Sequence, residues 1–566
     1  RTFYQEQVPA RGFQSSVEPA LHFGVGTADS VALTVTWPDQ TRERRTGVAA
    51  NQTVTLRQSD ARPAEPASPA GPPPLLASAG GERGLSFTHR ENEFVDYRAQ
   101  PLLPHMLSRE GPALASADVT GNGREDLFVG GARGQAAVLF LQRSDGTFEK
   151  RAPEAFAAHR THEDTDAVFF DADGDGDPDL YVVSGGKAGR GGADYQDRLY
   201  LNDGTGRFTH APDALPAIES SGGVVAAHDF NGDGRTDLFV GGRVWPGEYP
   251  LPPRSHLLEN TGGQFEDVTT EIAPLLFKPG MVTDALWSDL DGDGTTELVL
   301  AGEWMSIRAF EFGSVLFEEE TAELGLEGTT GWWYSLAAAD LTGDGAPELV
   351  AGNRGLNAQV QTAPDAPAAI YAADFARDGM PDPLMTHHLD GGEYPVYWHD
   401  DLVEAIPPFE NRFSSYEDYA TSTIGEILTD REQKTATRLT AATFETSVFL
   451  NEGGTLRRRA LPREAQLAPI HDLVVRDLNG DDRPDLLLAG NDFTVRPQWG
   501  RADAEKGTVL LNEGDLRFEV RRSRESGFFA PRDVRSMTLV GGPSPLVVVG
   551  NNDAPLSAFS LVSPPQ

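Results

Sequence analysis

The chain of 566 residues contains no cysteine. This absence excludes disulfide bonds, thiolate metal sites and cysteine nucleophiles. No apolar run is long enough to span a bilayer as a helix, and no secretory signal sequence is visible. Because the first residue is Arg1 and not Met, we expect the chain to be a mature or trimmed fragment of a longer precursor.

Basic residues are scarce relative to acidic ones. The chain has 47 Lys and Arg against 86 Asp and Glu, which gives a formal net charge of -39. Nucleic acids and anionic membrane surfaces are bound by clustered Lys and Arg, so this balance argues against both kinds of partner. The acidity can serve solubility, for example in a salty habitat, or it can supply metal ligands. The composition leaves both explanations open.

The chain is rich in glycine and proline, with 60 glycine residues and 40 proline residues. This composition is typical of proteins made of short strands and many turns. The hydrophobic content of 39% is sufficient for a folded core, and the length exceeds that of one small domain. We therefore expect either several domains or one large repeat array.

An acidic stretch from Asp171 to Leu180, with the sequence DADGDGDPDL, recurs in variants along the chain. Its carboxylates stand at the first, third, fifth and ninth positions, and its glycines allow sharp turns with positive φ. Crowded carboxylates need a counter-charge, and oxygen ligands in a tight loop suit Ca²⁺. The spacing begins like an EF-hand loop, but the last carboxylate comes at the ninth position and a strand pattern follows it.

Seven such loops predict structural calcium sites. The predicted ligands are side-chain oxygens of Asp118, Thr120, Asn122 and Asp126; Asp171, Asp173, Asp175 and Asp179; Asp229, Asn231, Asp233 and Asp237; Asp289, Asp291, Asp293 and Glu297; Asp340, Thr342, Asp344 and Glu348; Asp374, Asp378 and Asp382; and Asp477, Asn479, Asp481 and Asp485. The preference of Asp and Gly for turns explains one such loop. It does not explain why all seven loops carry a carboxylate at the ninth position. Loops with Asn or Thr in place of Asp carry less charge, so weaker binding is expected there. The loop with Ala376 at its third position is the weakest candidate.

The spacing of the loops predicts a β-propeller. The first five loops start about 50 to 60 residues apart, which suits one four-stranded blade per repeat. A strand of small apolar residues precedes each loop, a second strand follows it, and a third ends in a turn such as Asn202-Asp203-Gly204. Radially arranged four-stranded sheets make a propeller. Merging the segments that begin at Asp340 and Asp374 gives seven blades, and separating them gives eight.

The predicted domain plan has three parts. Residues 1–60 read as a small all-β module with Phe23 and Trp37 in its core, residues 61–84 as a Pro/Ala/Gly-rich linker, and residues 85–566 as the propeller.

Within the propeller, residues 405–440 predict a partly helical insertion, because apolar residues recur there at helical spacing. Residues 533–562 read as a degenerate last blade, closed by a strand from residues 85–95.

Histidines and acids suggest one alternative, an enzyme. His159 and His162 lie close together in sequence, and His387, His388 and His399 lie near several acids. Adjacent residues in a strand point to opposite faces, so His387 and His388 are poorly placed to bind one metal ion together. The chain has no nucleophile elbow, no phosphate-binding glycine loop and no HExxH motif. A non-enzymatic protein is therefore favoured, without catalytic residues.

The loops resemble the FG-GAP/VCBS calcium-binding repeats found in integrin α-chain propellers. The segments Gly12–Ser16, Leu21–Gly26, Trp37-Pro38 and Asn51–Thr53 resemble an ASPIC/UnbV domain. Their pairing is similar to the cartilage acidic protein 1 family and to large bacterial exported proteins, which Leu102–Pro104, Ser108–Pro112 and Gly331–Trp333 also resemble. In that family the ASPIC/UnbV domain usually follows a propeller, whereas here it comes first.

The resemblance implies a secreted or outer-surface protein that binds proteins or glycans in adhesion and belongs to a larger surface assembly. Two other functions stay open. A surface enzyme, glycan-active or redox, would bring carboxylates or histidines together on the central channel. A purely structural module of a fibre or complex would present a large apolar contact patch.

Overall fold

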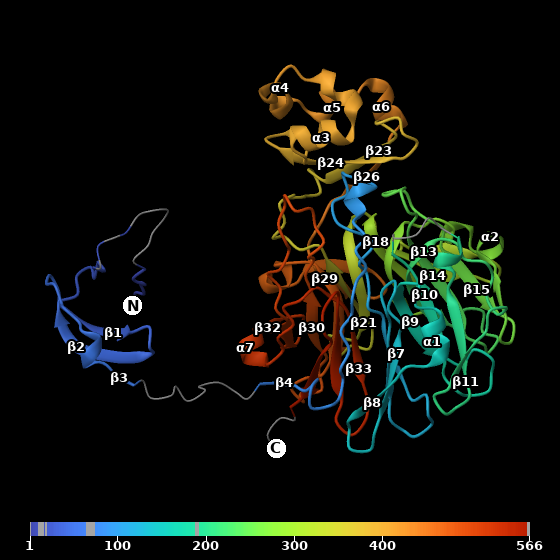
Figure 1. Ribbon diagram of the computed structural model, residues 1–566, viewed down its shortest axis with the longest axis horizontal. Helices are drawn as coiled ribbons and strands as arrows, with labels where there is room; N and C mark the ends of the chain where they lie inside the picture. The colour runs from blue at the N-terminus through green and yellow to red at the C-terminus, as the bar shows by residue number, and fades with distance from the viewer. Residues whose placement is uncertain are drawn as a thin grey trace. The chain divides into compact units, whose positions relative to one another are not determined.

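The computed structural model describes residues 2–8, 16, 18, 20–63, 74–186 and 192–562 (Figure 1). The chain divides into two compact units, residues 1–72 and residues 73–566. The Gly12–Ser15 part of the N-terminal resemblance lies outside the described residues. Among the residues described, no helix has both the length and the apolarity that a membrane crossing requires.

The first unit contains a three-stranded antiparallel sheet. Its strands are β1 (Ser30–Thr36), β2 (Thr41–Ala49) and β3 (Arg62–Pro63), and a 3-10 turn at Gln58–Asp60 precedes the last of them. Half-buried and exposed residues alternate along β1, as its sequence pattern predicts. The prediction that Phe23 belongs to a core is wrong, because its side chain is 38% exposed. A sheet this small covers only one side of its aromatic residues.

Groups of four antiparallel strands build the second unit. The first three groups, in pairing order, are β5 (Leu114–Ala117), β6 (Asp126–Val129), β7 (Val138–Gln142) and β8 (Phe148–Arg151); β9 (Asp164–Phe170), β10 (Asp179–Ser184), β11 (Arg198–Asn202) and β12 (Phe208–His210); and β13 (Ser221–His228), β14 (Asp237–Val244), β15 (His256–Asn260) and β16 (Phe265–Asp267). In each group the acidic loop joins the first strand to the second.

Four further groups follow. They are β17 (Met281–Ser288), β18 (Glu297–Met305), β19 (Arg308–Phe312) and β20 (Phe317–Glu319); β21 (Gly331–Ala339), β22 (Glu348–Asn353), β27 (Ser447–Asn451) and β28 (Leu456–Ala460); β29 (Ile470–Arg476), β30 (Asp485–Gly490), β31 (Thr508–Asn512) and β32 (Phe518–Arg521); and β33 (Val534–Val540), β34 (Leu546–Asn551), β35 (Ser557–Leu561) and β4 (Leu76–Ser78). A short pairing of β18 with β21 joins two of these groups into one larger sheet.

The first strands of the groups form a closed ring. They contact one another in the order β5, β9, β13, β17, β21, β29 and β33, and β33 contacts β5 again. Apolar side chains fill the space between neighbouring sheets, as where Tyr181 and Leu199 of one sheet meet Leu238 and Leu258 of the next. This radial arrangement of four-stranded sheets is that of a propeller, and the predicted all-β class is confirmed.

The last sheet takes its outer strand from the start of the second unit. Leu76 in β4 is fully buried, and Phe559 of β35 pairs with Ser78. The predicted linker of residues 61–84 is therefore too long. The outer strand of the last sheet is β4 and not a strand from residues 85–95, which one interpretation of the sequence allows, although Thr88 of that segment forms an isolated antiparallel bridge with Pro555. A three-residue strand that follows a Pro-rich stretch carries no local signal, because only pairing across the whole chain makes it a strand.

An insertion separates β22 from β27 and is larger than the predicted residues 405–440. It contains a sheet of β23 (Ala368–Ala373), β24 (Asp382–Leu389), β25 (Gly392–Pro395) and β26 (Thr437–Ala441), with helices α3 (His399–Ala405), α4 (Tyr416–Thr421), α5 (Ile424–Ile427) and α6 (Asp430–Thr435) and a 3-10 helix at Pro407–Arg412. Its Ile370, Phe409 and Ile424 share an apolar core with Tyr249 and Trp332 of the ring. The insertion therefore packs on the ring.

Short helices fill the connections between the other strands. They are α1 (Glu154–Ala158), α2 (Thr269–Ile272) and α7 (Ser523–Ser526), with 3-10 helices at Asp96–Arg98, Gly192–Tyr195, Pro274–Leu276 and Arg463–Gln466.

Candidate functional site

The first aspartate of each acidic loop organises the turn around its own carboxylate. One oxygen accepts a hydrogen bond from the sixth backbone N–H of the loop in all seven loops, at 2.6 to 3.1 Å. The other oxygen accepts from the fourth or fifth N–H. Glycine usually occupies the sixth position, because the backbone there adopts positive φ, as at Gly176 with φ 91°.

In the six blades that carry an acidic loop, the ninth carboxylate begins the second strand and is buried. Asp179 is 1% exposed, and its two oxygens accept hydrogen bonds from the N–H groups of Ala172, at 2.9 Å, and Asn202, at 2.8 Å. Asp485 repeats this pattern with Leu478 and Asn512. The ninth carboxylate therefore ties its loop to the third strand of the same sheet.

Three loops leave buried oxygens without a hydrogen-bond donor among the described residues. These oxygens are Oδ2 of Asp237, Oε1 of Glu297, and Oε1 of Glu348 with the nearby Oγ1 of Thr342. Burying a carboxylate oxygen without a partner is costly, so such atoms are rare in folded proteins. A cation in the loop would satisfy them, and the first three belong to the predicted ninth-position ligands. These donor sets therefore fit Ca²⁺.

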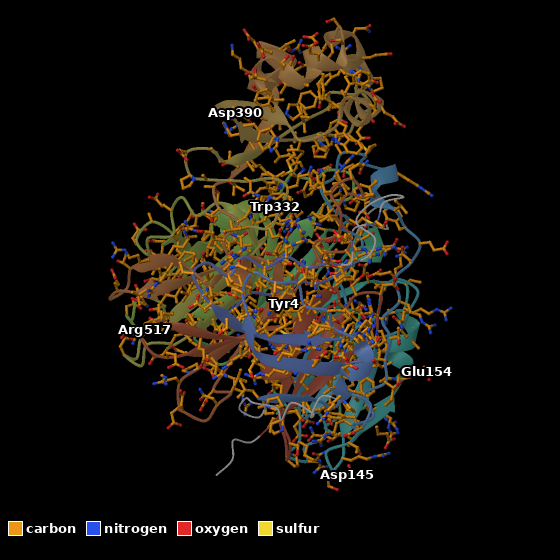
Figure 2. The ribbon with its side chains drawn as sticks, turned by 90° about the vertical axis from the view of Figure 1, so that its left-hand side faces the viewer. Tyr4, Asp145, Glu154, Trp332, Asp390 and Arg517 are labelled. Atoms are coloured by element: carbon orange, nitrogen blue, oxygen red, sulfur yellow. The ribbon has the colours of Figure 1, made fainter. Side chains whose placement is uncertain are left out.

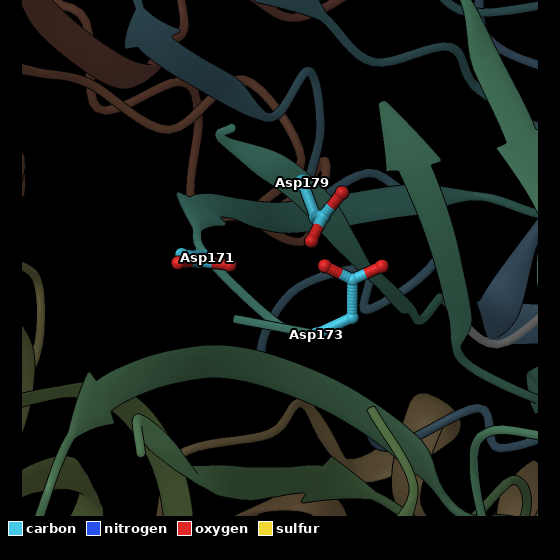
Figure 3. Close-up of side chains that lie close together, drawn as sticks. All are labelled: Asp171, Asp173 and Asp179. Atoms are coloured by element: carbon cyan, nitrogen blue, oxygen red, sulfur yellow. The ribbon is translucent and has the colours of Figure 1, made fainter. Parts of the chain in front are cut away.

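Carboxylates converge in two loops, as predicted for the most acidic ones. Oxygens of Asp171, Asp173 and Asp179 lie within 4.8 Å of one another, and Figure 3 shows the carboxylates of Asp173 and Asp179 facing each other. Asp289, Asp291 and Glu297 form the same kind of group. Spacing of this kind allows one hard cation to bind all three side chains.

Glu311 is a candidate ligand that the loop pattern does not reveal. It lies on β19 and forms a third group with Asp291 and Asp293, within the same 4.8 Å. Burial and the charges of these two aspartates raise its pKa. The only sequence signal is an acidic residue at an exposed end of the third strand, which has no fixed spacing from the loop.

Burial raises the pKa of most ninth-position carboxylates. The pKa of Glu297 is raised to about 8, chiefly by burial and further by Asp291 and Asp289. Burial raises the pKa of Asp237 to about 7 and that of Asp179 to about 6. Without a counter-charge these groups are costly to ionise at neutral pH, which is the condition that a bound cation removes.

The loop at Asp374 does not belong to a blade. It joins β23 to β24 within the insertion, so this segment does not form a blade of its own, which is one of the two alternatives that the sequence leaves open. Arg377 replaces glycine at its fourth position with φ 64°, and Asp382 is only half-buried. The short acidic pattern folds into the same turn here because its hydrogen bonds are local, whatever sheet surrounds it.

Three carboxylates line the axis of the ring. Asp166, Asp284 and Asp472 lie on β9, β17 and β29, and their charges raise the pKa of Asp284 beyond the effect of burial. Each is half-buried and bridges two inner strands, accepting one backbone N–H from its own strand and one from the next. Each oxygen therefore has a donor, and the three side chains act as staples between neighbouring sheets.

The histidines are held by neighbours in the same region of the chain. Nδ1 of His159 lies 3.0 Å from the Tyr200 hydroxyl, and its ring lies 4.3 Å from that of His210. Nδ1 of His399 lies 2.8 Å from Asp400. Burial lowers the pKa of His387. Among the described residues, none of the three-ligand groups that could hold a metal includes a histidine.

A buried ion-pair network lies where the ring meets the insertion. Glu303 accepts from Arg243 at 2.7 Å and from the Tyr249 hydroxyl at 3.1 Å, and its Oε1 lies 2.8 Å from Nε2 of His105. Burial raises the pKa of Glu303, but Arg243 and His105 outweigh this and hold it at about 2. The sequence gives no local signal for this network, because its members come from three distant segments.

Comparisons with known families confirm the resemblance. Residues 1–63 match the family described as "ASPIC and UnbV". Residues 118–182, 185–240 and 289–351 match the FG-GAP-like repeat. The chain therefore contains FG-GAP-like repeats behind an ASPIC and UnbV segment. No curated protein matches the chain by sequence.

Solved structures show only distant similarity. A lectin of Agrocybe aegerita that recognises non-reducing terminal N-acetylglucosamine is 15% identical over 74% of this chain and 80% of its own, with a TM-score of 0.37. The biofilm matrix protein Bap1 of V. cholerae is 10% identical over 87% and 92%, with a TM-score of 0.38. YCF48 from Cyanidioschyzon merolae is 11% identical over 81% and 97%, with a TM-score of 0.36. Similarity at this level assigns no function to the chain.

Proposed function

We propose that the chain is a calcium-stabilised, non-enzymatic binding protein built on a seven-bladed propeller. The observation behind the proposal concerns the ninth positions of three loops. There one carboxylate oxygen each of Asp237, Glu297 and Glu348 is buried and has no hydrogen-bond donor among the described residues. A cation would complete these loops and fasten the first two strands of each blade. Asp166, Asp284 and Asp472 each hydrogen-bond two neighbouring inner strands, which supports a structural role for the side chains along the axis of the ring.

The proposed place of action is the cell surface or the space outside the cell, in adhesion or within a larger surface assembly. Several loops carry Asn or Thr among their ligands, as at Asn231 and Thr342. Fewer charged ligands give weaker calcium sites, and extracellular modules commonly bind with dissociation constants of about 10⁻⁴ to 10⁻³ M. Such sites fill where calcium is millimolar. The partner would be a protein or a glycan at that surface.

Calcium titration of the metal-free chain tests the proposal. After exhaustive dialysis against chelator, we expect millimolar Ca²⁺ to raise the melting temperature by more than about 5 °C, because ligand that binds only the folded state stabilises it. Equal concentrations of Mg²⁺ are the control for ionic strength and should do much less, since Mg²⁺ is a poor fit to flexible all-oxygen loops. An unchanged melt, with no calcium retained by atomic emission, would falsify the calcium part. Surface proteolysis of intact cells of the native source tests the location.

A further inference from the structure

A pocket lies between the ring and the insertion. Its walls include Trp332 of β21, Met385 of β24 and Phe444, which precedes β27, with Trp499 from the segment after β30. The space within it and in front of its open mouth totals about 440 Å³, which includes open solvent. Figure 2 shows Trp332 at the end of the ring nearer to Asp390 of the insertion and away from Asp145. No acidic residue lines this pocket, although the chain has a net charge of -39.

Arg354 lines the pocket and forms no ion pair within the described part of the chain. Its side chain is only 8% exposed, and no described carboxylate lies within ion-pair distance, 4.0 Å, of its guanidinium. Its Nη1 is buried without a hydrogen-bond partner among the residues described. The charge of Asp492 acts on that of Arg354, but Oδ1 of Asp492 lies 3.7 Å from Arg535 and accepts from the backbone N–H and the hydroxyl of Thr494, each at 2.7 Å. A buried guanidinium without a carboxylate is costly unless something else binds it.

Two further donors belong to the same pocket. The indole Nε1 of Trp332 is buried without a partner among the described residues, and the residue is 3% exposed. Arg501 is exposed and forms no ion pair within the described part of the chain. Its guanidinium lies 4.9 Å from the centre of the Phe493 ring. The polar groups of Arg354, Trp332 and Arg501 at this pocket are therefore donors, which favour an oxygen-rich anion.

The walls of the pocket indicate what carries that anion. The rings of Trp332 and Phe444 lie 5.6 Å apart, and the half-buried Trp499 adds a third aromatic surface. The exposed amides of Asn357 and Gln359 stand at the same pocket. Aromatic faces stack on the C–H faces of sugar rings, planar amides bond to their hydroxyls, and a guanidinium binds a carboxylate with two parallel hydrogen bonds.

We propose that this pocket binds the carboxylate of an acidic sugar, such as a uronate unit of a surface polysaccharide. Arg354 would hold the carboxylate, Arg501 would close over it from the rim, and the aromatic side chains would contact the sugar ring. The inference rests on the proposed binding function and names its ligand class. A peptide carboxylate would use the same guanidinium, but it would leave the aromatic walls and the amides without a role.

Saturation-transfer NMR on the calcium-loaded full chain tests the proposal. We expect methyl β-D-glucuronide to bind with a millimolar dissociation constant and methyl β-D-glucoside, its neutral match, at least tenfold more weakly. Arg501→Ala, an exposed change, should weaken glucuronide binding at least threefold, and Arg354→Met at least tenfold. Arg517→Ala is the matched control, because that arginine is paired with Asp515 outside the pocket, and it should leave binding unchanged.

Several outcomes would overturn the proposal. Among them are equal binding of glucuronide and glucoside, tighter binding of N-acetyl-alanine than of glucuronide, and binding that neither Arg501→Ala nor Arg354→Met reduces. Circular dichroism establishes that each variant is folded, and Arg501→Ala keeps the test decisive if Arg354→Met is not. Loss of glucuronide binding with intact calcium stabilisation overturns this inference alone. Glucuronide binding without any calcium effect overturns only the calcium part of the proposed function.

Discussion

The side-chain Nδ2 of Asn202 donates a hydrogen bond of 2.9 Å to the carbonyl oxygen of Val119, which lies in the acidic loop of the preceding sheet. Asn260, Asn451 and Asn512 make the same contact to the second residue of the preceding loop. The backbone N–H of Asn202 also donates to the ninth carboxylate of its own loop. The asparagines that end the third strands therefore connect the acidic loops of neighbouring blades.

Replacing Asn202 tests this connection. Asn202→Ala leaves the carbonyls of Val119 and Pro178 without this donor; the bond to Val119 is buried and the bond to Pro178 is part-buried. We expect the free energy of unfolding to fall by about 1 to 3 kcal/mol, measured by urea denaturation in calcium. Asn411→Ala, at an exposed position, is the control and should change it by less than about 0.5 kcal/mol. Equal effects of the two changes would show that the inter-blade bond adds no stability.

Replacing Glu297 separates calcium binding from the cost of burying a carboxylate. Glu297 is 1% exposed, and burial raises its pKa to about 8. Glu297→Gln removes a charged ligand, so we expect the calcium-induced rise in melting temperature to shrink by several degrees. In chelator the same variant should melt at or above the wild-type temperature. The amide that replaces the buried carboxylate carries no charge, so the free-energy cost of ionising a buried group disappears. Differential scanning calorimetry with and without Ca²⁺ measures both.

The control for Glu297→Gln is Asp145→Asn, an exposed aspartate in a turn outside the acidic loops. It should leave the response to calcium unchanged. If Glu297→Gln destabilises the chain equally in calcium and in chelator, Glu297 supports the fold without binding the cation.

The sequence predicts the repeating unit well, because its signals are local. The spacing from Asp171 to Asp179 and the asparagine turn at Asn202 each lie within a few residues of the bonds that they make. These local sequence patterns predict the all-β class, the four-stranded groups and the FG-GAP-like repeats. The donors of the buried oxygens, and the absence of donors at Asp237 and Glu348, require coordinates.

Long-range pairing sets the limit of prediction. Leu76–Ser78 becomes a strand only because β35 comes to lie beside it at the other end of the chain. The loop at Asp374 has the same local pattern as the blade loops, and only the pairing of β22 with β27 shows that it lies in an insertion. The Trp332–Arg354 pocket gathers residues from five segments, so no sequence window contains it.

The loop at Asp374 offers a test of its placement outside the blades. Asp378→Ala removes an exposed predicted ligand from the loop in the insertion, whereas Asp175→Ala removes one from a blade. We expect Asp175→Ala to lower the melting temperature of the ring in calcium by several degrees. Asp378→Ala should leave it within about 1 °C and raise amide hydrogen exchange only within residues 368–441. Exchange that spreads from Asp378→Ala into the blade strands would contradict the assignment.

The axial carboxylates predict how stability changes with pH. Burial raises the pKa of Asp166 and of Asp472 from 3.8 to about 7. The folded chain therefore keeps these protons up to about pH 7, whereas the unfolded chain releases them near pH 4. Because the folded state binds more protons in this window, the free energy of unfolding should fall as the pH rises from about 4 to 7. Asp284, whose pKa is also raised by burial, adds to the same trend.

Urea denaturation at several pH values, in excess calcium, measures this slope. Asp472→Asn cannot titrate, so its slope between pH 5 and 7.5 should be shallower than that of the wild type. The free energy of unfolding of this variant should also be lower. The N–H groups of Leu473 and Met537 each donate to one oxygen of Asp472, so in the amide one of them would face a nitrogen that cannot accept its hydrogen bond. Asp145→Asn, whose exposed carboxyl has a lowered pKa, should keep the wild-type slope in this range. An unchanged slope in Asp472→Asn would show that this carboxylate is already ionised in the folded chain at pH 5, and that the staple works in its charged form.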